Sequence, residues 1–156
     1  MRRNDKAITD RAALDAIIRS SQVCHLALAK DNWPYLVPVS FGYDGRAIYL
    51  HTATEGTKLE FFQANPQVCF EFECNVEVRR HPDLACKWSM AYESVIGFGV
   101  IRELVEVAAR DYALNEIMRQ YSGRTWSFDP VIVARTRVWQ IEINELTGKR
   151  SYTKTT

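Results

Sequence analysis

The chain has 156 residues and a mass of 18.0 kDa, which is the size of one domain, and we expect a single domain over residues 1–156. Its composition, 47% hydrophobic and 25% charged, excludes a disordered chain. The net charge of +1 gives no overall electrostatic basis for binding nucleic acid or an anionic membrane, so we expect neither partner.

The apolar runs of the sequence are the length of strands, so no segment is expected to span a bilayer. The first ten residues contain basic side chains without the apolar run of a secretory signal, which predicts a cytoplasmic protein. In that compartment the cysteines stay reduced, so we expect no disulfides. The cysteines are Cys24, Cys69, Cys74 and Cys86.

The first half of the sequence predicts two helices and three strands. Residues 9–19 read as a helix with Thr9 as its N-cap, and residues 57–64 as a second helix ended by Asn65-Pro66. Alternation of apolar and polar residues predicts the strands. The predicted strands are residues 23–29, 35–42 and 47–52, the last two joined by a hairpin at Asp44-Gly45.

The second half predicts three more strands and one helix. The strands cover residues 67–78, 88–106 and 136–146, and the second should bend or bulge at Gly97 and Gly99. A helix is expected over 108–121 with Gly123 beyond its end. Residues 79–85 and 122–134 read as loops, and the residues after 146 as a polar tail.

Six strands with added helices predict a mainly β fold, a small closed antiparallel barrel that leaves no exposed edges. The interior of such a barrel is filled by side chains, so a ligand should lie outside it, against a second subunit.

The segment from His51 to Lys58 (HTATEGTK) carries the clearest binding signal. A strand ends there and a helix begins, and the free amides at a helix N-terminus attract anions. Thr57 and Lys58 add a hydroxyl and a positive charge. Two interpretations stay open, a phosphate cradle or a capped helix with a solvated lysine; the P-loop spacing is absent.

The order of several segments resembles the pyridoxamine 5′-phosphate oxidase-like, FMN-binding split barrels, and within them the nitroimidazole-resistance (Nim-type) flavoproteins. The resemblance covers nearly the whole chain. Its segments are Arg2-Arg3, residues 33–40 (WPYLVPVS), the Asp44-Gly45 hairpin, 49–52 (YLHT), 55–59 (EGTKL), Asn65-Pro66, 68–72 (VCFEF), 86–88 (CKW), 92–99 (YESVIGFG) and 146–150 (LTGKR).

The resemblance implies a six-stranded antiparallel split β-barrel with flanking helices, acting as a homodimer with FMN at the subunit interface. It implies that the strand over residues 36–41 lies along the flavin ring, that Thr57 and Lys58 bind the phosphate, and that Ser94 reaches the flavin from the partner subunit. The implied cofactor-binding residues are Leu36, Val37, Pro38, Val39, Ser40, Phe41, His51, Thr52, Thr57, Lys58, Trp88, Tyr92 and Ser94.

The implied activity is reduction of a small electron-poor compound, nitroaromatic or quinone-like, with electrons from a transiently bound reduced nicotinamide. Oxidases for pyridoxamine phosphate carry an arginine before the phosphate lysine and a C-terminal Arg-Leu-His-type segment. This chain has Thr57 and no such segment, which argues against synthesis of pyridoxal phosphate. Many Nim-type sequences have histidine where this chain has Thr57. Two alternatives stay open, a flavin-storage protein and a haem-binding relative.

Three histidines occur in the chain. His51 is the catalytic candidate, because an imidazole beside the flavin can donate a proton or a hydrogen bond; the alternative is a packed strand-end histidine. His25, within a strand, reads as a structural histidine. Cys74, His81 and Cys86 lack the paired spacing of a metal site, so no metal is expected.

Overall fold

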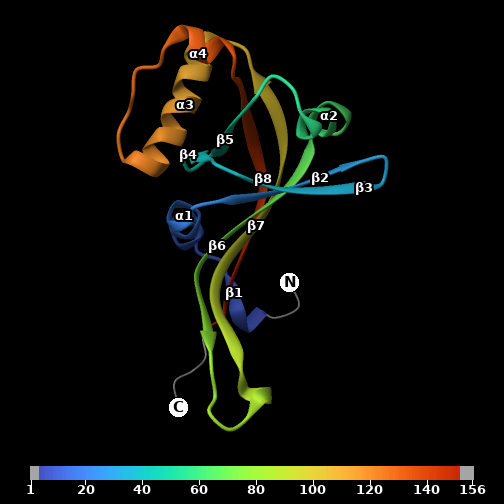
Figure 1. The fold of residues 1–156 in the computed structure, drawn as a ribbon. Coiled ribbons are helices and arrows are strands. Elements are labelled where there is room, and N and C mark those ends of the chain that lie inside the picture. Colours follow the sequence, from blue (N-terminus) through green and yellow to red (C-terminus); the bar gives the residue numbers. More distant parts are fainter. Residues whose placement is uncertain (1–3, 152–156) are drawn as a thin grey trace.

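The computed structural model describes residues 4–151, so Arg2-Arg3 and the end of the predicted polar tail lie outside the described residues. The described strands form one antiparallel sheet in the order β3-β2-β6-β7-β8-β5-β4, with β1 beside β8 (Figure 1). The six long strands are β2 (Cys24–Lys30), β3 (Trp33–Val39), β5 (Ala47–Thr52), β6 (Gln67–Arg79), β7 (Ser89–Leu104) and β8 (Arg137–Ser151).

These six strands are the six that the sequence predicts, and two short ones are added to them. β1 (Ala7–Ile8) and β4 (Gly42–Tyr43) have two residues each, too few for alternation to reveal. The Asp44-Gly45 turn therefore joins β4 to β5 rather than β3 to β5.

The sheet curls around a core without closing through hydrogen bonds. β3 and β4 lie at opposite ends of the strand order and are joined only by the chain at Ser40 and Phe41. The expectation of full closure is thus wrong, while the antiparallel split barrel with flanking helices is confirmed. The residues that fill its centre with no more than 1% exposure include Leu26, Phe41, Ile48, Leu50, Phe70, Phe72 and Ile141.

Within residues 4–151, four α-helices flank the sheet: α1 (Arg11–Ser20), α2 (Thr57–Ala64), α3 (Val107–Ser122) and α4 (Pro130–Ala134). The Asp10 carboxylate accepts a hydrogen bond from the Ala13 amide (3.0 Å), so the N-cap of α1 is Asp10 rather than Thr9. α4 lies in a segment predicted as loop, although Asp129 caps it and Pro130 occupies its first turn.

Two glycines let the long strand β7 pass close to its neighbours. A Cβ at Gly97 would lie 2.3 Å from the Phe70 ring, and the register between β7 and β8 shifts at Phe98/Gly99. This shift confirms the irregularity predicted for the strand.

None of the helices within residues 4–151 combines the length and the apolar character needed to cross a lipid bilayer.

Candidate functional site

The end of β5 and the start of α2 bring together the residues of the predicted phosphate cradle. β5 ends at Thr52, a short turn follows, and α2 begins at Thr57. Gly56 precedes the helix with a φ of 135°, a backbone conformation that side-chain-bearing residues rarely adopt. The glycine therefore lets the chain enter the helix at this angle.

The inner side of this junction is held by a buried indole. The Nε1 of Trp139 on β8 donates to Thr52 Oγ1 (3.0 Å), and that hydroxyl donates to the Ala53 carbonyl (2.8 Å). The indole also packs against Phe62 of α2, with ring centroids 4.9 Å apart. Thr52 thus points into the barrel, and Trp139 ties the end of β5 to α2.

The N-terminus of α2 has no side-chain cap. Carboxylates cap α1 and α4, but no side chain accepts from the first amides of α2. Thr57 is exposed and Lys58 half-buried. Among the described residues Lys58 joins no ion pair. Free amides, a hydroxyl and an unneutralised ammonium at one helix start suit an anion such as phosphate.

His51 lies at the same junction with an exposed side chain. Partial burial, and then the positive charge of Lys58, lower the pKa of His51 below its ordinary value of 6.5. The imidazole is therefore mostly neutral at physiological pH, and it can donate or accept a hydrogen bond there without adding charge.

β3 presents alternate residues to opposite sides, as a strand must. Leu36, with 65% of its surface exposed, faces outward together with Pro38, whereas Val37 and Val39 pack against the core. Beyond the strand, Ser40 is exposed.

Phe41 differs from the other residues of this predicted segment. Its side chain is fully buried, and its amide donates to the hydroxyl of Tyr121 (3.1 Å). The side chain and the amide of Phe41 are therefore already engaged within the fold.

Trp88, Tyr92 and Ser94 lie away from this junction within one chain. Trp88 precedes β7 at the tip of the β6–β7 hairpin, which extends away from α2 (Figure 1). Its indole donates to the His81 carbonyl (2.9 Å), and the Lys149 ammonium lies 5.6 Å from the Tyr92 ring centroid. A single subunit does not bring these residues to Lys58.

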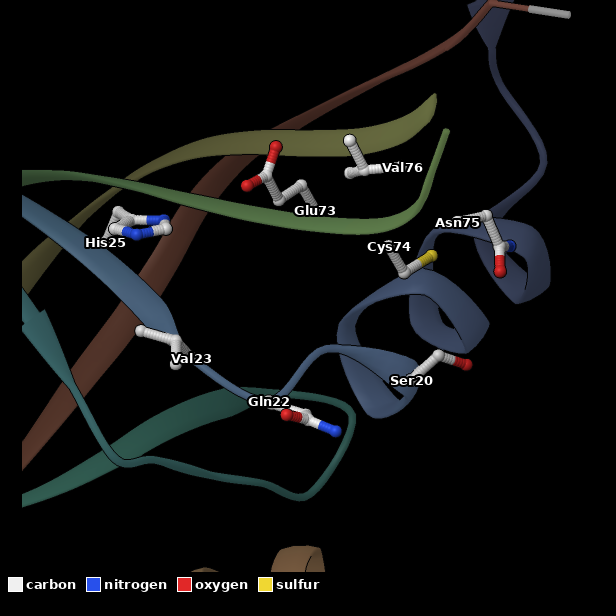
Figure 2. Close-up of a pocket in the computed structure, with 8 residues that line it drawn as sticks. All are labelled: Ser20, Gln22, Val23, His25, Glu73, Cys74, Asn75 and Val76. Atoms are coloured by element: carbon white, nitrogen blue, oxygen red, sulfur yellow. The ribbon is translucent and has the colours of Figure 1, made fainter. Parts of the chain in front are cut away.

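A second polar region, which the sequence does not predict to have a binding role, lies on the outer side of β2. His25 Nδ1 lies 3.1 Å from Glu71 Oε2, and the two residues are opposite each other on β2 and β6. Beside them lies a cavity of about 400 Å³ (Figure 2). The alternation in residues 23–29 already predicts an outward His25, but its partner is 46 residues away in sequence.

Cys74, His81 and Cys86, the residues considered for a metal site, do not cluster in the structure. Within the described ranges, no group of three or more His, Cys, Asp or Glu side chains is placed to hold an ion. Cys74 donates weakly to Glu93 Oε2 (3.9 Å), and partial burial raises the pKa of this thiol. All four cysteines are free thiols.

Comparison with solved structures places the chain among known split barrels. A protein of Bacteroides thetaiotaomicron, provisionally named a 5-nitroimidazole antibiotic resistance protein, is 30% identical with a TM-score of 0.82, over 92% of this chain and 85% of that chain. An FAD and heme binding protein of Mycobacterium smegmatis is 20% identical with a TM-score of 0.81, over 95% of this chain and 74% of that chain. At 20% identity the likeness shows the fold alone.

Comparison of sequences gives one short match and one long one. An uncharacterized protein of Rhizobium meliloti (strain 1021) is 23% identical over 64 residues, which are 41% of this chain and 42% of that protein. The match thus spans less than half of that curated relative. The profile of the family described as pyridoxamine 5′-phosphate oxidase matches residues 10–150. The chain therefore belongs to the pyridoxamine 5′-phosphate oxidase family.

Proposed function

We propose that the protein binds FMN at the junction of β5 and α2 and reduces small electron-poor compounds, nitroaromatic or quinone-like, with electrons from a reduced nicotinamide. The observation that carries the proposal is the uncapped start of α2, where Thr57 and Lys58 lie in the first turn and Lys58 forms no ion pair with another described residue. Family membership supports it, because this helix start occupies the place that the resemblance gives to the phosphate site.

Different residues of the chain would bind the phosphate and the flavin ring. Lys58 would supply a charge-assisted hydrogen bond to the phosphate, and the amides of α2 would supply further donors. The outward side of β3, with exposed Leu36 and Pro38, would back the ring. When bound, the flavin supplies the electron-transfer chemistry, and the protein supplies binding, orientation and electrostatics. His51, mostly neutral, would hydrogen-bond to the ring or to a substrate.

A homodimer would complete the site. Trp88, Tyr92 and Ser94 cannot reach α2 of their own chain, but in a pair of subunits they could reach the partner's. The outer side of the sheet carries apolar residues suited to such a contact, since Ile96 and Phe98 on β7 are 42% and 50% exposed. Light scattering of the flavin-loaded protein should give twice the chain mass.

Absorption of the purified protein separates the flavin proposal from the haem alternative. A bound flavin gives broad bands in the blue and near ultraviolet, whereas haem gives a sharp Soret band. Mass spectrometry of the released ligand then identifies FMN or FAD. Rapid bleaching by a reduced nicotinamide without air, followed by return of the colour with naphthoquinone, separates a reductase from a storage protein.

The substitution Lys58→Glu tests the phosphate site. It places a negative charge against the phosphate, so FMN affinity should fall by about 10- to 100-fold. This range corresponds to the loss of one charge-assisted hydrogen bond. Riboflavin, which has no phosphate, should lose much less. Isothermal titration of both ligands into the flavin-free protein measures the effect.

The matched control is Arg46→Glu, an equal change of charge at the exposed β4–β5 turn. It should leave FMN affinity unchanged. Equal losses for FMN and riboflavin in Lys58→Glu, or full FMN binding by that variant, would place the phosphate elsewhere.

A further inference from the structure

His25 lies beside the strand that is proposed to back the flavin ring. It is opposite Pro38 of β3 on one side and opposite Glu71 of β6 on the other. Residues directly opposite each other on neighbouring antiparallel strands share a face, with Cβ atoms about 4.5–5.5 Å apart. A ligand lying along the outward side of β3 would therefore be within one side-chain length of the imidazole.

Glu71 fixes the state and direction of this imidazole. An ionised carboxylate only accepts hydrogen bonds, so the 3.1 Å contact requires that His25 Nδ1 carry a hydrogen. Nε2 is then the ring nitrogen that takes up and releases a proton. The side chains of His25 and Glu71 are 37% and 30% exposed, so a small molecule can reach them.

The adjoining cavity has the size of a small-molecule site. Its volume of about 400 Å³ lies within the usual range for such sites. Figure 2 shows it between the start of β2, the far end of β6 and the last turn of α1. Its lining is mixed: Val23 and Val76 are apolar, Gln22 and Asn75 are polar, and Glu73 adds a carboxylate, while none of the described residues that line it is a lysine or an arginine. Such a lining favours neutral or cationic molecules over anions.

We propose that this cavity is the substrate pocket of the reductase, that it takes neutral, flat acceptors such as quinones, and that His25, oriented by Glu71, donates a proton to the reduced substrate. This inference rests on the proposed function. Conversion of a quinone to a hydroquinone takes two electrons and two protons. When bound, the reduced cofactor would supply one proton and both electrons as hydride. The second proton would leave Nε2 of the His25 imidazolium for the quinone oxygen, and solvent would then return a proton to the neutral imidazole.

The test compares two electron acceptors in the flavin-loaded variant His25→Asn. Asparagine places an amide near the position of Nδ1, so the hydrogen bond to Glu71 is kept while the transferable proton is lost. Oxidation of the reduced protein is followed by stopped flow. Reduction of naphthoquinone should slow by about 10- to 100-fold, which reaches the lower limit of what a general acid usually contributes. Ferricyanide takes an electron without a proton, so its reduction should be unchanged.

A binding measurement without turnover accompanies the kinetics. The chain has three histidines, so their ring signals can be assigned by NMR from single substitutions. Naphthoquinone added to the oxidised, flavin-loaded wild type should shift the Cε1–H signal of His25 and leave that of His81 unchanged. Because it uses the wild-type protein, this NMR measurement still tests the pocket if His25→Asn does not bind flavin.

The outcomes separate the two proposals. Wild-type protein that binds no FMN refutes the proposed function itself. Loaded protein in which His25→Asn slows both acceptors equally, or neither, overturns the role of His25. A His25 signal that is indifferent to naphthoquinone overturns the pocket.

Discussion

The two histidine regions of this barrel carry opposite charges around the same kind of side chain. His51, at the end of β5, lies near Lys58, and partial burial with that cation lowers its pKa. His25, on β2, lies against Glu71 and beside a cavity whose lining includes Glu73 and no cation. Both imidazoles stand on strands and both reach solvent, so strand position alone does not distinguish them.

The difference indicates that the neighbouring charge determines which role each imidazole can take. A cationic helix start with a neutral imidazole suits a phosphate, whereas a carboxylate beside an imidazole suits delivery of a proton. The proposed cofactor would have its anionic tail at the first region and its reactive ring, along β3, toward the second. Under this proposal the two regions would be complementary parts of one site, and the following predictions separate them.

The largest effect is expected from substitution of Trp139, whose indole holds the end of β5 next to His51. Trp139→Phe keeps the packing against Phe62 but removes the donor to the buried Thr52 hydroxyl. The free energy of unfolding should fall by about 1–3 kcal/mol, the usual loss when a buried hydrogen-bond partner is left unpaired. Because α2 is anchored through the same indole, FMN affinity should fall more than riboflavin affinity. Urea unfolding and titration measure these quantities, while the His25 region should be unaffected.

Trp126→Phe is the matched control. Its indole also donates to a hydroxyl, that of Ser122 (2.9 Å), but the ring is 42% exposed. Water can replace the lost partner, so the loss of stability should stay within about 0.5 kcal/mol. If the two substitutions cost the same, Trp139 has no special role at the junction.

The sequence predicts local features of this molecule well and distant contacts poorly. Alternation predicts the six long strands, and the His51–Lys58 segment is predicted as a binding site because its strand end, glycine and lysine are contiguous. The prediction of a polar tail is wrong for Thr147–Ser151, because this polar segment becomes a strand only by pairing with Tyr92–Ile96 of β7 and with β1.

The same limit applies to the second region. The sequence predicts His25 to be a satisfied strand histidine, and its contact with Glu71 across β2 and β6 agrees with this, but nothing near it in sequence indicates Glu71 or the cavity. Only the pairing of β2 with β6 creates that contact. The segment of α4 shows a different failure, since the sequence predicts a loop over residues 122–134 although Asp129 and Pro130 form a helix start there.

A smaller effect is expected at the cavity beside His25. Glu73→Gln removes the carboxylate from the lining, so reduction of an anionic acceptor, naphthoquinone sulfonate, should improve relative to neutral naphthoquinone. Because Glu73 is exposed and screened by salt, the ratio of the two rates should change only by about two- to fivefold at low ionic strength. Glu77→Gln, on the hairpin outside the cavity, should leave the ratio unchanged. An unchanged ratio in Glu73→Gln would place the acceptor elsewhere.

The smallest effect concerns the pKa of His51 in the flavin-free protein. Lys58→Met removes the nearby cation, so the pKa of His51 should rise toward 6.5 without reaching it, because partial burial remains. A lowered pKa means that, below pH 6.5, the unfolded chain binds more protons than the folded one, so stability falls as pH falls through this window. Lys58→Met should weaken this dependence.

NMR titration of the His51 ring and urea unfolding at several pH values measure the two quantities. Lys30→Met, which removes a cation that instead pairs with Glu60 (3.8 Å), should leave the pKa of His51 unchanged. If both lysine substitutions move it equally, the general charge of the molecule governs His51. The contrast with His25 would then lie in Glu71 alone, and the cationic character of the helix start would no longer distinguish the two regions.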